Sequence, residues 1–232
     1  MSELRVLSGG APQEALAVLT PAFEAQSRHK LHFTFMVITA IQQKLAAGET
    51  IDIAIVPVPI IDSLAKAGIL DGARRAALGV IGLSMIAREG LPRPDISTPE
   101  AFRQALLAAG SLVHATPTAT PSGAHLARLL EQLGIAAAVQ GKVIHRPALD
   151  GGVELVARGE ADLGIYPTSE VVHAKGVTLV GPLPATAQLR TVYGAAVATA
   201  SAAPEAAGAF VQFLSDPGNR RVWRDAGFDP AA

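Results

Sequence analysis

The chain has 232 residues, half of them hydrophobic and 17% charged, which suffices for one large or two small globular domains with apolar cores. Its 19 Lys and Arg nearly balance its 20 Asp and Glu, and aromatic residues make up only 4%, so neither a basic nucleic-acid-binding surface nor a base-stacking platform is expected. Cysteine is absent, which excludes disulfides and thiolate chemistry.

The amino terminus lacks the features of a secretory signal. Residues 1–3 lead directly into an apolar strand, without the basic start, apolar run and small-residue cleavage site that a signal needs. As written, the sequence predicts a cytoplasmic protein, or a periplasmic one if a signal was removed and Met1 added. No apolar run is long enough to span a bilayer, so no membrane insertion is expected.

The first 68 residues predict alternating strands and helices. The expected strands are 4–7, 31–36 and 51–56, and the expected helices are 13–25, 40–47 and 60–67. Thr39 has the side chain of an amino-terminal cap for the second helix. The turn Gly9-Gly10-Ala11 places backbone N–H groups where they could hold an anion, although a plain connecting turn fits the same residues.

Two apolar segments predict connections between two lobes. Residues 78–87 are expected to form a strand that crosses from the first lobe into the second, and residues 191–198 a strand that crosses back. Lobe 1 then contains residues 1–79 and 191–232, and lobe 2 contains residues 80–190. Two crossings form a hinge, which is the usual basis for closure around a ligand.

The second lobe repeats the alternation. The expected strands are 112–114, 142–145, 163–166 and 177–180, and the expected helices are one ending at 109, one over 126–133 and one over 171–174. After the chain returns to lobe 1, terminal helices at 204–214 and 217–225 are expected to pack there. A hydroxyl-rich loop, residues 116–123, precedes the helix that contains Leu126.

A short phrase occurs twice in the chain. Gly48–Pro57 and Gly159–Pro167 both contain Gly-Glu, then Asp, then an apolar strand that ends at Pro, and each follows an apolar helical pattern. The repetition predicts two α/β lobes built alike. Ligands bind at the carboxyl ends of such strands, so a cleft between two such sheets is the expected binding place.

The order and spacing of these segments match a known family. The matching pieces are Val6–Phe23, Gln42–Gly48 running into Asp52, Thr116–Gly123, Gly159–Glu170, and Phe210–Leu214 followed by Arg224–Phe228. These pieces are spread over nearly the whole chain, from residue 6 to residue 228. The chain resembles the type II periplasmic solute-binding proteins and is most similar to the molybdate-binding branch of the ABC importers.

This resemblance implies an α/β fold of two Rossmann-like lobes joined by a hinge of two crossing strands. It also implies a monomer without a cofactor or metal that captures a small oxyanion or carboxylate between the lobes and hands it to an ABC permease. The ligand-binding positions that the resemblance implies are Gly9, Gly10, Ala11, Ile38, Thr39, Pro121, Ser122, Gly123, Leu149, Asp150 and Tyr166.

Departures from the family pattern fall at some of these positions. The family's first-loop hydroxyl falls at Ala11, and its tyrosine falls at Pro167, one place after Tyr166. Helix starts and glycine turns still favour an anion. Replacing Ser122 by Pro or Gly123 by Val is expected to weaken binding with little loss of fold.

Two alternatives stay open. One is an enzyme on the same scaffold, resembling aconitate isomerase, which shifts a proton along an unsaturated tricarboxylate; its candidate bases are His114, His145, Tyr166 and Glu170. The other is a cytoplasmic sensing domain. His29 and His32 are closely spaced, but no carboxylate or third ligand accompanies them, so no metal site is expected there.

Overall fold

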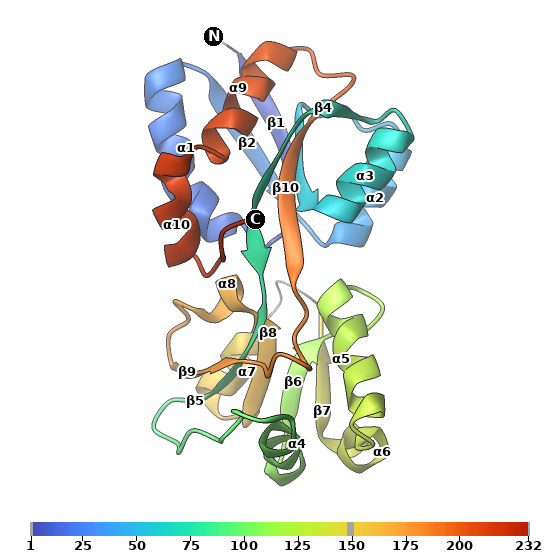
Figure 1. Ribbon diagram of the computed structural model, residues 1–232, viewed down its shortest axis with the longest axis vertical. Coiled ribbons are helices and arrows are strands. Elements are labelled where there is room, and N and C mark those ends of the chain that lie inside the picture. Colours follow the sequence, from blue (N-terminus) through green and yellow to red (C-terminus); the bar gives the residue numbers. More distant parts are fainter. Residues whose placement is uncertain (1, 148–150, 232) are drawn as a thin grey trace. The chain divides into compact units, whose positions relative to one another are not determined.

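The computed structural model describes residues 2–147 and 151–231. It divides into two compact units: unit 1 contains Met1–Ile81 and Thr191–Ala232, and unit 2 contains Gly82–Arg190 (Figure 1). Each unit has its own five-stranded sheet covered by helices. The prediction of an α/β fold with two similar lobes is confirmed.

The sheet of unit 1 has the strand order β2-β1-β3-β10-β4. The first three strands in chain order are parallel: β1 (Glu3–Ser8), β2 (Lys30–Phe35) and β3 (Ile53–Pro57). The late strand β10 (Thr191–Ala198) is antiparallel to both β3 and the edge strand β4 (Leu70–Ile81). The parallel strands therefore end at one common edge, where their connections to helices begin.

Helices cover both faces of this sheet, each over its own apolar core. On one face lie α1 (Gln13–Ser27), α9 (Pro204–Leu214) and α10 (Arg220–Asp225), which bury Phe23, Phe210 and Trp223 among other side chains. On the other face lie α2 (Ile38–Ala46) and α3 (Val58–Lys66), which bury Ile41 and Ile61 (Figure 1). The burial of both faces explains why β3 is apolar throughout.

The sheet of unit 2 has the equivalent order, β7-β6-β8-β5-β9. The strands β6 (Leu112–Ala115), β7 (Val143–Arg146) and β8 (Leu163–Pro167) are parallel. The strand β5 (Leu83–Arg88) is antiparallel to both β8 and β9 (Val177–Pro182). This unit also has one edge at which three parallel strands end together.

The helices of unit 2 are likewise divided between the two faces. The first face packs against α4 (Pro99–Ala108), α5 (Pro121–Gln132) and α6 (Ala136–Val139). The second packs against α7 (Gly152–Arg158) and α8 (Thr168–Val171). Side chains alternate between faces along a strand, so neighbouring residues of β6 or β8 belong to different cores.

The first crossing differs from the prediction of one strand over residues 78–87. It consists of two strands, because β4 ends at Ile81 and β5 begins at Leu83. The carbonyl of Gly82 accepts the N–H of Thr168 (2.9 Å), and the Gln188 side chain accepts the N–H of Leu83 (2.6 Å) and donates to its carbonyl (3.0 Å). The backbone is thus held by partners in unit 2 from Gly82 onwards. The predicted return strand is β10 and lies entirely in unit 1.

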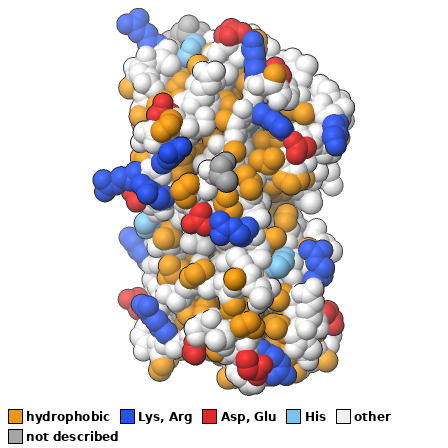
Figure 2. All heavy atoms as spheres, in the orientation of Figure 1, with side chains coloured by type: hydrophobic (Ala, Val, Ile, Leu, Met, Phe, Trp, Pro, Cys, Tyr) orange, Lys and Arg blue, Asp and Glu red, His pale blue; other side chains and the backbone are white. Residues whose placement is uncertain are grey.

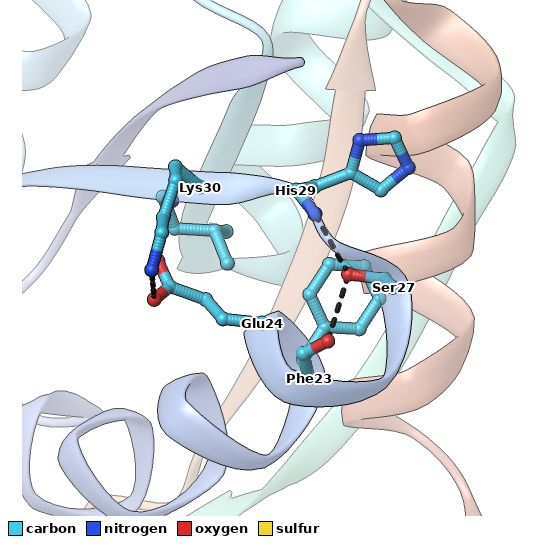
Figure 3. Close-up of polar contacts among 6 residues, drawn as sticks. Phe23, Glu24, Ser27, His29 and Lys30 are labelled. Atoms are coloured by element: carbon cyan, nitrogen blue, oxygen red, sulfur yellow. Dashed lines mark hydrogen bonds and ion pairs between the residues drawn. The ribbon is translucent and has the colours of Figure 1, made fainter. Parts of the chain in front are cut away.

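The connection from α1 to β2 shows how local polar contacts fix a turn (Figure 3). Arg28 adopts a left-handed conformation (φ 59°) after the end of α1. Ser27 Oγ donates to the Phe23 carbonyl at 2.7 Å and accepts the N–H of His29 at 3.3 Å. An ion pair between Lys30 and Glu24 (2.8 Å) then joins β2 to the helix.

The surface carries charges of both signs. On the face drawn in Figure 2, basic and acidic side chains are intermixed, in keeping with the net charge of −1. None of the helices built from the described residues combines the length and apolarity needed to cross a membrane.

Candidate functional site

The carboxyl-end edge of unit 1 brings together the predicted residues Gly9 and Ile38. The N–H of Gly9 donates to the Ile55 carbonyl (3.0 Å), which fixes the turn after β1 against β3. A β-carbon at Gly9 would lie 2.8 Å from Ile38 Cδ1 and 3.2 Å from the hydroxyl oxygen of Tyr193. Gly9 is therefore a glycine because the start of α2 and the ring of Tyr193 pack directly against its backbone.

The side chains of Ala11 and Ile38 face the apolar cores of unit 1. Both are less than 7% exposed, and they belong to the cores under α1 and under α2 respectively. Gly10 lies between Gly9 and Ala11 in the turn after β1, where its carbonyl accepts the N–H of Gln13 (3.0 Å). Besides the hydroxyl of Thr39, which is exposed in the first turn of α2, this edge offers an anion backbone N–H groups.

The predicted capping role of Thr39 is wrong. The helix α2 begins one residue earlier, at Ile38, after Val37 in an extended conformation, and no side chain of the described residues caps it. The helix α1 also begins without a side-chain cap. In the described part of the chain, the two helix starts beside Gly9 thus lack a side-chain cap, and the helix dipole adds to the attraction of their N–H groups for negative charge.

Tyr193 was missed by sequence reasoning. It lies on β10 opposite Pro57, is 7% exposed, and stands edge-on to Phe228 with 6.1 Å between ring centroids. Its place beside Gly9 depends on the strand order, which joins residues far apart in the chain. The sequence has only two tyrosines, and both lie on predicted strands. This rarity was the one feature of the sequence that could have drawn attention to Tyr193.

In unit 2, the predicted residues Pro121, Ser122 and Gly123 form the first turn of α5. The hydroxyl of Thr120 accepts the N–H of Gly123 (3.0 Å) and lies 3.0 Å from the Ser122 hydroxyl. The hydroxyls of this loop thus bind the helix start and each other. One of the N–H groups expected to hold an anion is already occupied.

Gly123 has a structural role that the sequence did not indicate. A β-carbon at this position would lie 2.5 Å from the carbonyl oxygens of both Ala115 and Thr116. The helix α5 therefore starts in direct backbone contact with the end of β6. The expectation that Gly123→Val leaves the fold largely intact is wrong, because two backbone carbonyls cannot move aside cheaply.

Tyr166, the last residue but one of β8, lies on the face that packs against α7 and α8, and it is 4% exposed. Its hydroxyl lies against Gly152 at the start of α7, where a β-carbon would collide with it. Burial, reinforced by Glu170 and Glu154 and opposed by Arg146, raises the pKa of Tyr166. Tyr166 therefore keeps its proton near neutral pH. The predicted residues Leu149 and Asp150 lie outside the described residues.

Glu170 lies on α8, one helical turn beyond the end of β8, and its side chain is partly buried. This burial raises the pKa of Glu170 to about 7. A carboxyl group that is half protonated near neutrality can both give and take a proton at that pH.

His114 and His145 lie on the opposite face of the same sheet. His114 pairs in register with Ile165, so its side chain points to the α4–α5–α6 face while that of Tyr166 points to the other. The two imidazole rings stand edge-on with centroids 4.9 Å apart, and together with α5 and α6 they line a cavity of about 400 Å³. Burial lowers the pKa of His114, whose Nδ1 lies 2.8 Å from the Ala115 carbonyl. The four candidate bases are thus divided into two pairs on opposite faces of the sheet, His114 with His145 and Tyr166 with Glu170.

A search of the described residues finds no group of three His, Asp or Glu side chains able to hold a metal ion. Tyr166 and Glu170 supply a hydroxyl and a carboxyl group, which can form hydrogen bonds and transfer protons.

Comparisons with known proteins agree with this architecture. A family model described as bacterial extracellular solute-binding protein matches residues 4–229. An aconitate isomerase of Pseudomonas sp is 32% identical over 236 aligned positions, which cover 99% of this chain and 88% of the relative. The molybdate-binding protein of Escherichia coli (strain K12) is 27% identical over 160 positions, which cover 68% of this chain and 62% of the relative.

The fold is shared with solved structures at lower identity. The periplasmic molybdate-binding protein of Azotobacter vinelandii superposes with a TM-score of 0.82 and 16% identity, over 99% of this chain and all of the other. This likeness supports the type II periplasmic-binding fold.

Proposed function

This chain belongs to the bacterial extracellular solute-binding protein family, and from that premise we propose that it binds a small anion at the carboxyl-end edges of its parallel strands. The proposed role is capture of this anion and delivery to an ABC permease. An extracytoplasmic location is proposed from the family alone.

One observation carries the proposal of an anion. At the edge of unit 1, the starts of α1 and α2 have no side-chain cap and lie beside the tight turn at Gly9. Backbone N–H groups and the positive ends of two helix dipoles converge there, which is the arrangement that favours carboxylate, sulfate or phosphate groups.

Among small anions, the side chains at the predicted site positions favour a carboxylate over a tetrahedral oxyanion as the ligand. Ala11 and Ile38 face apolar cores, and the hydroxyls of Thr120 and Ser122 are bonded within their own loop. Few side-chain hydroxyls are thus left to surround a compact oxyanion. A relative that acts on aconitate, at 32% identity over nearly the whole chain, supports a di- or tricarboxylate.

Thermal unfolding with candidate ligands tests this proposal. Succinate, citrate, trans-aconitate, sulfate and molybdate are added at matched ionic strength, with chloride as the control. A ligand at one hundred times its dissociation constant should stabilise the protein by about 2.7 kcal/mol. The proposal predicts a shift with at least one carboxylate and a smaller one with molybdate; no shift with any of the five would contradict it.

A second candidate function is isomerisation of an unsaturated carboxylate, favoured by the ionisable carboxyl of Glu170 beside Tyr166. In such a reaction Glu170 would remove a proton from a carbon of the substrate, the electron pair would move along the double bond, and the proton would return to another carbon. Proton NMR of trans-aconitate in deuterated buffer tests this. Deuterium incorporation and cis product, both lost in Glu170→Gln, support the enzyme, whereas binding without exchange supports the binding protein alone.

A further inference from the structure

The β8–α8 corner, which comprises Tyr166, Ser169 and Glu170, is polar where the matching corner of unit 1 is apolar. The repeated phrase aligns the two units without gaps from its Asp onwards, because β3 and β8 occupy the same place in their sheets. The residues of unit 1 that match the corner are Val56, Pro59 and Ile60. The same fold is therefore built with apolar side chains at these positions, and the polar ones in unit 2 need another explanation.

Two hydroxyl groups in this corner are buried without a partner among the described residues. They belong to Tyr166 and Ser169, whose side chains are 4% and 3% exposed. A buried polar group without a hydrogen bond costs roughly 1–3 kcal/mol. Unsatisfied groups of this kind are rare in folded proteins, and many of them bind a ligand, a water molecule or an ion.

The start of α7 is shaped around one of these hydroxyls. Gly152 has no left-handed backbone angle that would require a glycine, yet a β-carbon there would collide with the Tyr166 hydroxyl. The glycine therefore serves to make room for the tyrosine oxygen. Phenylalanine at 166 would fill the same core without this requirement.

The charged groups near the corner are Glu154 on α7 and Arg146 on β7. Glu154 raises the pKa of Tyr166 and Arg146 lowers it. The pKa of Glu170 is raised by burial of its carboxyl group. The corner thus offers three oxygen-bound protons, from Tyr166, Ser169 and the protonated carboxyl of Glu170.

We propose that Tyr166, Ser169 and Glu170 form a subsite for one carboxylate of the ligand, held by neutral O–H donors, with Glu170 taking up a proton as the anion binds. This inference rests on the anion binding proposed above. A carboxylate placed beside Glu170 disfavours a second negative charge, so it binds the protein in which Glu170 is protonated. Uptake of the proton relieves the repulsion and supplies the third donor.

Binding of trans-aconitate, measured by titration calorimetry at pH 6 and pH 8, tests the inference. Between these values the protonated fraction of a group with a pKa of about 7 falls from about 90% to about 10%, so the apparent affinity of the wild type should fall about tenfold. Glu170→Gln removes the titrating group and should make the affinity nearly independent of pH. Glu89→Gln makes the same change at an exposed site of unit 2 and should behave as the wild type.

Proton uptake is measured directly by repeating the titration at pH 8 in two buffers of different ionisation enthalpy. The wild type and Glu89→Gln should take up protons on binding, and Glu170→Gln should not. Tyr166→Phe should bind about tenfold more weakly, the loss expected for one hydrogen bond, without a lower midpoint of unfolding. A structural hydroxyl would instead lower the midpoint when removed.

The outcomes separate the two proposals. Binding with the same pH dependence in wild type and Glu170→Gln overturns the inference and leaves anion binding intact. Binding of trans-aconitate, citrate and succinate at neither pH overturns both.

Discussion

Asp52 and Asp162 perform the same task in the two units. The carboxylate of Asp52 accepts the N–H of Arg5 on β1 at 2.8 Å, and that of Asp162 accepts the N–H groups of Gly110 and Ser111, just before β6, at 2.7 and 3.2 Å. Each aspartate thereby anchors the beginning of the parallel strand next to its own. The repeated phrase in the sequence thus marks a shared way of joining neighbouring strands.

Replacing Asp162 by Ala should lower the free energy of unfolding by about 2–3 kcal/mol, because two backbone N–H groups lose their acceptor. This is less than the full value of two hydrogen bonds to a charged group, since one of the two bonds is exposed and the other only partly buried, so water replaces part of what is lost. Urea denaturation measures the change. Glu160→Ala, in the same phrase but with an exposed side chain, is the control and should stay within about 0.5 kcal/mol of the wild type. Equal losses in both variants would contradict the anchoring role.

Replacing Gly123 by Ala should destabilise the protein by about 2–3 kcal/mol, since the added β-carbon would press on the carbonyls of Ala115 and Thr116. Gly141→Ala is the matched control: no atom lies within 4 Å of its β-carbon position, and its φ is not left-handed. The control should be neutral or slightly stabilising. A neutral Gly123→Ala would show that α5 can move away from β6.

Much of the fold could be predicted because the signals are local. The strand 191–198 and the helix 204–214 have the predicted bounds, since one is a continuous apolar run and the other begins at a proline. The start of β4 at Leu70 was missed. As an edge strand with Arg74 and Arg75 it alternates in exposure and has no apolar run before residue 78.

The contacts at the site depend on packing that local signals do not contain. Tyr193 meets Gly9 only because β10 inserts beside β3. Among the hydroxyls of the loop 116–123, the sequence does not say which one caps α5, and the structure assigns this role to Thr120. The polar contrast at the β8–α8 corner could have been read from the repeat once its two copies were aligned through to Glu170.

The contact between Gly152 and Tyr166 predicts a strong coupling between the two positions. Gly152→Ala alone should destabilise the protein by about 2–3 kcal/mol, because its methyl group would occupy the place of the hydroxyl. Tyr166→Phe removes that oxygen, so the double variant should lose clearly less than the sum of the single losses. Thermal or urea unfolding of the four proteins gives the coupling energy, and simple additivity would mean that the hydroxyl does not face Gly152.

The raised pKa of Glu170 predicts how stability depends on pH. The folded protein holds the proton up to about pH 7, whereas an unfolded glutamate loses it near pH 4.5, so between these values the native state binds more protons. The contribution of Glu170 to stability is therefore complete below pH 4.5 and is lost as the pH rises to about 7. Glu170→Gln, which cannot ionise, should gain roughly 2 kcal/mol over the wild type between pH 5 and pH 8. Urea unfolding at both pH values measures this difference, with Glu89→Gln as the exposed control; a gap between Glu170→Gln and wild type that does not change with pH would show that the carboxyl is solvated and titrates normally.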